Sequence, residues 1–332
     1  MRNYHFWSVL TLFLFLTVVG LAPAGADIPR PSRYVTVDYS TIDAYARNTP
    51  ESAARTLQSL SQYLTAPARS DLARARSVYS WIATHVRYDE SAFSGRTYAS
   101  ETAYANRVLA SRKAVCTGFA LLYKELLTRA GIQVINIKGY ARTNDSEAGM
   151  PIARIDHEWN AVQLDGDWYL LDLAWALTTA KTPGTANDFY FLTEPAAFAA
   201  NHFPADSRWQ LLTNPISKSR FDQFPKVYDA YFRLGFDTGF PQAGLLQAGD
   251  MLTLTLSSDE PVEFSCAQGA LGGSVLTATP VTVRQSGTTY RLSIPVNRPG
   301  KSTLCLFAKP KGAPTERLKS YEGILSFTVV SR

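Results

Sequence analysis

The sequence predicts an α+β domain followed by a small all-β sandwich. Three observations lead to this fold class. Apolar residues follow helical spacing over residues 70–86 and again after Cys116, an Asp165-Gly166 pair joins two short segments of strand character, and short alternating segments recur after residue 240. With 46% hydrophobic and 12% aromatic residues, the chain can bury a substantial core.

Residues 1–26 have the pattern of a secretory signal peptide. Arg2 gives a basic start, an apolar run extends from about residue 9 to residue 22, and Ala24-Gly25-Ala26 forms an A-x-A cleavage site. An uncleaved membrane anchor is the alternative, but the run is shorter than the roughly 18–20 residues of a span. We therefore expect an exported protein, periplasmic or extracellular, with no integral membrane span after cleavage.

Charge and cysteine content exclude several classes of function. The formal charge is +5, and removal of Arg2 with the leader leaves +4 without any Lys/Arg block, so no nucleic-acid partner is expected. The three cysteines, Cys116, Cys266 and Cys305, form no C-x-x-C pair, and one of the four histidines lies in the leader. A zinc cluster is therefore not predicted, and we expect neither a metal nor a cofactor.

The roughly 305 residues after the leader predict two domains behind a lead-in over 27–66, which contains a helical stretch at 51–64. In the first domain, 67–235, Ser70 caps an amphipathic helix that reaches Val86, and a second helix is predicted from 101 to 111. His85 is expected to pack at the end of the first helix. A strongly apolar third helix follows Cys116 and stops at Gly131, and 132–141 is predicted to be a strand.

The segment from His157 to Asp172 is predicted to be a hairpin, because Asp-Gly is typical of a two-residue type I′ turn. If Leu164 and Asp167 pair beside that turn, Trp159 faces Asp172, and His157 lies two residues further on the same face. The imidazole and the carboxylate are then within side-chain reach of each other. We expect that face to turn toward Cys116.

The chain after Asp172 is predicted to be rich in loops, with a strand at 189–192 and a domain boundary in the Gly- and Pro-containing stretch 236–247. From 240 to 332, short strands at regular spacing predict a β-sandwich of immunoglobulin-like type. Cys266 and Cys305 both fall on its strands, where a disulfide and two buried thiols are equally consistent with the sequence.

Cys116 is the candidate nucleophile. It stands at the start of the third helix with Lys113 upstream, and both the helix terminus and the ammonium favour thiolate over thiol. Together with a histidine that has its own acid, it completes a catalytic triad in which Cys116 attacks a carbonyl carbon, His157 carries the proton and Asp172 orients His157.

An oxyanion formed by that attack needs hydrogen-bond donors, of which the amide of Cys116 is one. The sequence does not single out the second donor, for which Tyr98, Asn106 and Trp159 are candidates. Gly118 would let the backbone approach a substrate. Trp159 and Trp175 are expected to line the site or to pack beside the triad.

Several of these blocks together resemble the transglutaminase-like superfamily. Lys113-Ala-Val-Cys-Thr-Gly-Phe-Ala120, Gly139-Tyr-Ala-Arg142, His157-Glu-Trp-Asn-Ala-Val162 and Trp168-Tyr-Leu-Leu-Asp172 look like a bacterial exported member of the branch with kyphoscoliosis peptidase and hillarin. His202-Phe-Pro-Ala-Asp-Ser-Arg-Trp-Gln-Leu-Leu212 is similar to a stretch that follows the core in that branch. The resemblance implies a papain-like fold and a Cys-His-Asp triad, carried onto Cys116, His157 and Asp172.

The chain departs from that pattern at two places that border the site. Glu158 stands where relatives often have a small residue, and Leu173-Ala-Trp-Ala176 replaces an expected Thr-Trp-Gly. Proteins of the family that this chain resembles include peptidases, amide cross-linkers, deamidases and inactive scaffolds, so the resemblance does not fix the reaction. We expect hydrolysis of peptide or glutamine amide bonds, because the sequence contains no recognisable calcium loop. The expected partner is a protein or peptide, with the cell envelope as one source of it. Amide cross-linking, deamidation and a non-catalytic binding module remain the alternatives.

Overall fold

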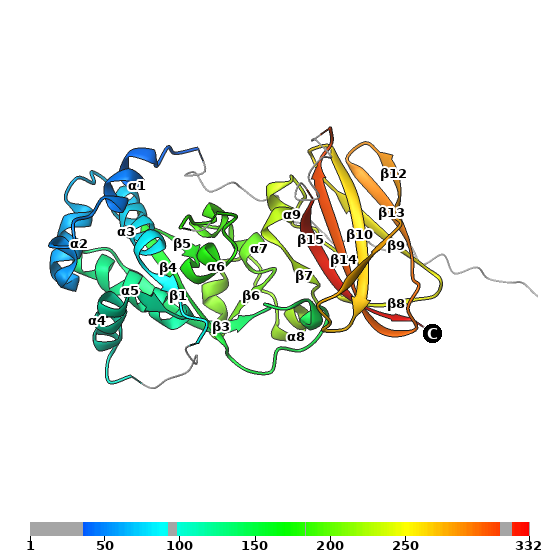
Figure 1. Cartoon of the computed structure of the whole chain (residues 1–332), viewed down its shortest axis with the longest axis horizontal. Helices are drawn as coiled ribbons and strands as arrows, with labels where there is room; N and C mark the ends of the chain where they lie inside the picture. The colour runs from blue at the N-terminus through cyan, green and yellow to red at the C-terminus, as the bar shows by residue number, and fades with distance from the viewer. Residues whose placement is uncertain (1–35, 92–97, 183, 313–320, 332) are drawn as a thin grey trace, which may run out of the picture.

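The computed structural model of the chain describes residues 36–91, 98–182, 184–312 and 321–331 (Figure 1). The predicted leader, residues 1–26, lies outside them. Helices gather at the N-terminal end of the molecule, coloured blue to teal, and strands gather at the C-terminal end, coloured yellow to red (Figure 1). The protein therefore has an α+β core followed by all-β sheets, as the sequence predicted.

The helical part contains five α-helices: α1 (Ser40–Arg47), α2 (Leu57–Thr65), α3 (Asp71–His85), α4 (Glu101–Ser111) and α5 (Cys116–Arg129). Helix α3 begins where the sequence predicted, because the Ser70 hydroxyl accepts a hydrogen bond from the amide of Ala73. Helix α5 ends before Gly131, whose φ of 81° is the left-handed conformation that stops a helix. Helix α1 was not predicted, and the 3-10 turn η1 (Ala53–Arg55) precedes α2.

Helix α5 packs against a four-stranded antiparallel sheet in the order β5-β4-β3-β6. Its strands are β3 (Val134–Ala141), β4 (His157–Leu164), β5 (Asp167–Leu171) and β6 (His202–Pro204). Leu164 pairs with Asp167, so the predicted hairpin register is confirmed. Gly166, with φ of 91°, and Asp165, with φ of 50°, supply the two positive φ angles that a type I′ turn requires.

Short elements fill the rest of this part of the chain. They are β1 (Arg87–Tyr88), β2 (Lys113–Ala114), η2 (Asp145–Glu147), α6 (Leu173–Thr178), η3 (Asp188–Tyr190), α7 (Pro195–Phe198), η4 (Ser207–Gln210), α8 (Lys218–Asp222) and α9 (Asp229–Arg233). The strand predicted at 189–192 is wrong: the segment begins as the 3-10 turn η3, which the Asn187 side chain caps. Tyr190 and Leu192 are buried in the core that the helices share, and the Tyr190 ring lies 5.6 Å from that of Trp175 in α6.

The C-terminal part consists of two sheets that enclose a common apolar core. One contains β12 (Thr282–Ser286), β13 (Thr289–Pro295) and β9 (Met251–Ser257). The other runs β11 (Leu276–Thr279), β10 (Val262–Ala270), β14 (Gly300–Pro310), β15 (Glu322–Ser331) and β7 (Lys226–Val227), with β8 (Leu245–Ala248) also paired to β15. Strands β7, β8 and β11 were not predicted.

Cys266 and Cys305 are both free and buried. Cys266 lies opposite Leu306 in the ladder between β10 and β14, so Cys305 is out of step with it by one residue. Because neighbouring residues of a strand point to opposite faces, Cys266 enters the core between the sheets, whereas Cys305 approaches Asp145 at 3.8 Å. The structure thus favours two buried thiols over the disulfide that the sequence left open.

The two parts of the molecule share a polar contact. The Asp145 carboxylate, in η2, accepts hydrogen bonds from the hydroxyls of Ser326, at 2.8 Å, and Tyr228. Strand β7, which comes before the predicted boundary, pairs with β15 through Leu325 and Val227. Within the described residues, no helix combines the length and the apolar character that a membrane crossing requires.

Candidate active site

Cys116 is the first residue of α5 and is buried. The first amides of a helix have no acceptor within it and carry a partial positive charge, so this position favours an anion. The sequence suggested that Gly118 lets the backbone approach a substrate, but the structure shows another use for this glycine. A β-carbon there would come within 2.9 Å of both Ala114 and Val108, so the missing side chain lets α4 pack closely on α5.

His157 and Asp172 meet at the open end of the hairpin. His157 Nε2 lies 2.6 Å from Asp172 Oδ2, and both side chains are buried. Asp172 follows β5 directly and caps α6, because its Oδ1 accepts the amide proton of Trp175 at 3.0 Å. His157 also interacts with Cys116, and this interaction contributes to the raised pKa of the imidazole, so the structure brings the three predicted residues together.

The surroundings of His157 and Asp172 shift the pKa values of both side chains. Burial alone would lower the pKa of His157, but the charge and hydrogen bond of Asp172 and the contact with Cys116 outweigh it and raise that pKa to about 10. Burial likewise opposes ionisation of Asp172, yet the charge of His157 and hydrogen bonds from two histidines hold the pKa of the carboxyl well below its usual range. An imidazolium paired with a carboxylate is the arrangement that both shifts favour.

The expectation that one whole face of the hairpin turns toward Cys116 is wrong. The other face, with Glu158 and Asn160, packs on α5: the Asn160 amide donates to the Ala120 carbonyl at 3.1 Å. His157 reaches Cys116 because it stands at the very end of β4, near the start of the helix. Trp159 extends away from α5 toward Phe198, at a ring separation of 5.8 Å.

Glu158 connects the elements that carry Cys116 and His157. Its carboxylate accepts hydrogen bonds from the Thr117 hydroxyl at 2.9 Å and from the Asn136 amide at 2.7 Å. Thr117 adjoins Cys116 and Glu158 adjoins His157 along the chain. This departure from the family pattern therefore fixes the start of α5 against the end of β4.

The candidates for a second oxyanion donor lie in different places. Asn106 is exposed and donates back to the Thr102 carbonyl, and Tyr98 packs edge-on against Tyr104. Trp159 is buried behind His157. None of these observations directs the three groups at the Cys116 thiol.

Tyr88 was missed by the sequence reasoning and lies beside the thiol. Strand β1 pairs in parallel with β2 through Tyr88 and Ala114, two residues before Cys116. Burial raises the pKa of the Tyr88 phenol, and negative charge on Cys116 would raise it further. The side chain is 39% exposed, so it borders the site on the solvent side. A two-residue strand leaves no periodic signal from which its position could have been predicted.

Trp175 is half-buried and separates the triad from a cavity of about 310 Å³. Its ring centroid lies 5.9 Å from that of His157. On the cavity side, the Lys226 ammonium lies 5.4 Å from the Trp175 ring and donates to the carbonyls of Arg142 and Thr143. Burial lowers the pKa of Lys226 to about 8. Trp175 lines this cavity, whereas Cys116, His157 and Asp172 do not, so a role of Trp175 in lining the catalytic site stays a prediction.

A second histidine, His202, also contacts the acid. Its Nε2 lies 3.0 Å from Asp172 Oδ2, the oxygen that His157 approaches. His157, Asp172 and His202 are ligand types that bind zinc, and their ligand atoms lie within 4.8 Å of one another. The contacts of 2.6 and 3.0 Å are nevertheless shorter than the roughly 3.3 Å between ligands around tetrahedral zinc. They are hydrogen bonds within a buried cluster.

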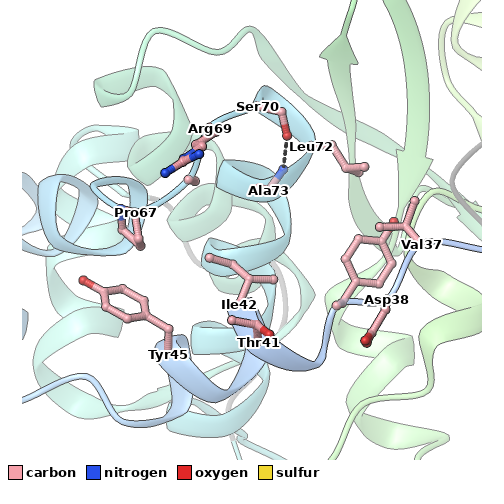
Figure 2. Close-up of a pocket in the computed structure, with 12 residues that line it drawn as sticks. Val37, Asp38, Thr41, Ile42, Tyr45, Pro67, Arg69, Ser70, Leu72 and Ala73 are labelled. Atoms are coloured by element: carbon pink, nitrogen blue, oxygen red, sulfur yellow. Dashed lines mark hydrogen bonds between the residues drawn. The ribbon is translucent and has the colours of Figure 1, made fainter.

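A larger cavity, of about 350 Å³, lies far from this cluster. It is formed by α1 and the residues before and at the start of α3, with Ile42, Tyr45 and Pro67 among its lining (Figure 2). No member of the triad lines it. The candidate site is therefore identified from the contacts of Cys116 and His157 and not from the size of a cavity.

Part of this chain is similar to known proteins. Residues 58–173 match the model of the transglutaminase-like superfamily. The chain is 32% identical to the kyphoscoliosis peptidase of Mus musculus over 215 residues, an alignment that covers 63% of this chain and 32% of that protein. It is 30% identical to the Homo sapiens protein of the same name over 233 residues, with 68% of this chain and 35% of that protein covered. Hillarin of Drosophila melanogaster is 26% identical over 241 residues, with 64% and 28% covered.

This chain spans about a third of the length of these relatives. The family match, residues 58–173, includes α5 and the hairpin. The similarity to the transglutaminase-like superfamily is thus carried by residues 58–173.

Proposed function

We propose that this protein is a cysteine-dependent acyl-transfer enzyme that acts on peptide or glutamine amide bonds of proteins. The observation that carries the proposal is the buried series of contacts from Cys116 through His157 to Asp172, in which His157 Nε2 lies 2.6 Å from the carboxylate. A purely structural core has no need of an ionised pair beside a thiol at a helix terminus. An acyl-transfer site requires all three groups.

In the proposed mechanism, the Cys116 thiolate attacks the carbonyl carbon of the amide while His157 is protonated. The negative oxygen is met by the backbone amide of Cys116 at the start of α5. The C–N bond then breaks, His157 gives its proton to the departing amine, and a thioester remains on Cys116. Asp172 holds His157 with Nε2–H toward the carboxylate, so that Nδ1 faces the thiol.

Water completes the cycle in the favoured version. His157 takes a proton from the water as it attacks the thioester, and the free acid and the thiol are released. A primary amine in place of water would give a new amide by the same steps. The relatives called peptidases support hydrolysis.

We further propose that the enzyme is exported and meets its substrate in the periplasm or outside the cell. The basic start, apolar run and A-x-A site of residues 1–26 support this. A protein or peptide of the cell envelope is the substrate class that such a location supplies.

The proposal is tested by incubating the protein with mixed envelope proteins and a labelled primary amine, followed by mass spectrometry. Cut chains indicate a peptidase, amine adducts a cross-linking enzyme, and glutamine converted to glutamate a deamidase. Cys116→Ala should abolish the product, whereas Cys266→Ala, which changes a thiol far from the site, should not. Equal product from wild type and Cys116→Ala would contradict the mechanism.

A binding module without catalysis is distinguished by the thiol itself. Iodoacetamide should modify Cys116 at pH 6 if the thiolate is held by His157. A Cys116 that is inert at pH 6, together with no product in any incubation, would favour the scaffold.

A further inference from the structure

The Asp172 carboxylate serves two imidazoles through one oxygen. His157 Nε2 lies 2.6 Å and His202 Nε2 lies 3.0 Å from Oδ2. His202 comes from β6, which pairs with β3 through Ala141 and reaches the triad from the side opposite α5. Its side chain is 1% exposed. A buried imidazole is costly without a hydrogen-bond partner, and Asp172 is the side chain that supplies one.

Aromatic packing holds the His202 ring in place. The ring stacks on Phe198 with centroids 4.0 Å apart and 24° between planes, and it lies 4.4 Å from Trp175 and 5.1 Å from Trp159. Trp175 and Trp159 also contact His157. A ring enclosed on these sides cannot turn Nε2 away from the carboxylate without disturbing the surroundings of both histidines.

The proton on His202 can be assigned from its partners. A carboxylate oxygen only accepts, so Nε2 must carry a proton. Burial lowers the pKa of His202 and outweighs both the attraction of Asp172 and a hydrogen bond to the backbone of Phe198, so the ring stays neutral. Its single proton lies on Nε2, because a charged carboxylate is a stronger acceptor than a backbone carbonyl. Asp172 then accepts three N–H groups: from His157, from His202 and from the amide of Trp175.

We propose that His202 is a positioning residue of the triad, which fixes the Asp172 carboxylate and takes up part of its negative charge, so limiting how tightly the His157 imidazolium is held. This inference rests on the proposed acyl-transfer function. An imidazolium that is held too tightly is a poor proton donor to the leaving amine. Sharing the carboxylate would keep His157 oriented and still able to release its proton.

Three other titratable groups sense the charge of Asp172: the phenols of Tyr79, Tyr88 and Tyr190. Burial is the main cause that raises each of their pKa values, so all three are neutral over the working range. Cys116 acts on His157 directly. Changes in the titration of His157 after substitution of His202 therefore report on the shared carboxylate.

The test compares His202→Phe, which keeps an aromatic ring and removes the donor, with His202→Gln, which restores an N–H near the position of Nε2. The pKa of His157 is followed by NMR of protein labelled with ¹⁵N-histidine, assigned with His157→Gln. We expect His202→Phe to raise this pKa by up to about one unit and to lower kcat about tenfold with little change in KM. The Gln variant should stay near wild type.

The matched control is His85→Phe, the same exchange at a half-buried histidine stacked on Trp81, away from the triad. It should change neither the titration of His157 nor kcat. An unchanged titration in a folded His202→Phe variant would overturn the inference.

Should that variant not fold, the wild-type spectrum decides, since the proposal requires protonated Nε2 and unprotonated Nδ1 on His202. A Cys116 that resists iodoacetamide at pH 6 in the wild type would instead count against the proposed function, so the two failures are distinguishable.

Discussion

Replacing Asp172 by Asn should damage catalysis far more than folding, and the structure shows why. The two carboxylate oxygens accept three N–H groups: Oδ1 that of Trp175, and Oδ2 those of His157 and His202. Asparagine offers one acceptor oxygen and one NH₂ group, which only donates. Two orientations of the amide are available, and each fails in a different way.

If the amide oxygen faces Trp175, the cap of α6 survives and the NH₂ group faces the histidines. His157 must then accept at Nε2 and carry its proton on Nδ1, where it points at Cys116 and cannot take the thiol proton. If the oxygen faces the histidines, the NH₂ group meets the amide proton of Trp175 and the cap is lost, at about 0.5–2 kcal/mol. In both orientations the charge that stabilises the imidazolium is gone.

The same exchange in a serine-protease triad lowers kcat about 10⁴-fold, and we expect a loss of about 10³–10⁴-fold here. Unfolding free energy should fall by only about 1–3 kcal/mol, the cost of one buried unsatisfied group. Urea unfolding measures the second quantity, and initial rates on a cleaved envelope protein measure the first.

Alkylation of Cys116 between pH 5 and pH 8 gives an independent readout. Asp172→Asn should be alkylated more slowly than the wild type at pH 6, because the carboxylate that holds the His157 imidazolium beside the thiol is gone. Asp167→Asn, at an exposed position of the same hairpin, is the control. Equal rates in the wild type and in folded Asp172→Asn would refute the role given to the carboxylate.

Three further predictions follow from other contacts. Gly139→Ala should destabilise the fold by about 1–3 kcal/mol in urea, because its β-carbon would come within 2.3 Å of the Phe203 carbonyl, whereas Gly249→Ala, with open space around it, should not. Glu158→Gln should cost about 1–2 kcal/mol through weakened charge-assisted hydrogen bonds and should also lower kcat; an unchanged kcat would remove its link to the triad. The pKa of His157 is raised to about 10, so the stabilisation that its protonation gives is complete below about pH 6.5 and is lost as pH rises toward 10. The urea midpoint of the wild type should therefore decline over that pH window. The decline should be smaller in His157→Gln.

Local chemistry made the central part of the site predictable from sequence. The register of the hairpin follows from Asp165-Gly166, because a two-residue turn fixes which residues pair. The place of Cys116 at a helix start follows from the helical spacing of apolar residues after it. The prediction of which face of the hairpin turns toward Cys116 was wrong. The alternation of side chains along a strand shows that His157 and Glu158 point to opposite sides, but it does not show which side packs on α5.

Contacts between distant segments escaped prediction for a physical reason. His202 approaches Asp172 only because β6 pairs with β3, and three-residue strands have too little pattern to reveal their partners. Tyr88 is placed by a two-residue strand in the same way. The strand predicted at 189–192 failed because a run of aromatic residues is equally suited to packing against helices, as Tyr190 does.

The pairing of β7 with β15 has a consequence for how this chain can be divided. Lys226 of β7 lies opposite Ser326 in the ladder and donates to the carbonyl of Arg142, directly after the strand that supports His157. A fragment ending near residue 235 would keep Lys226 but lose the strand beside it, together with the hydroxyl of Ser326 that binds Asp145. The C-terminal sheets thus support the half of the chain that holds Cys116, and that half on its own would have an unsupported loop next to the candidate site.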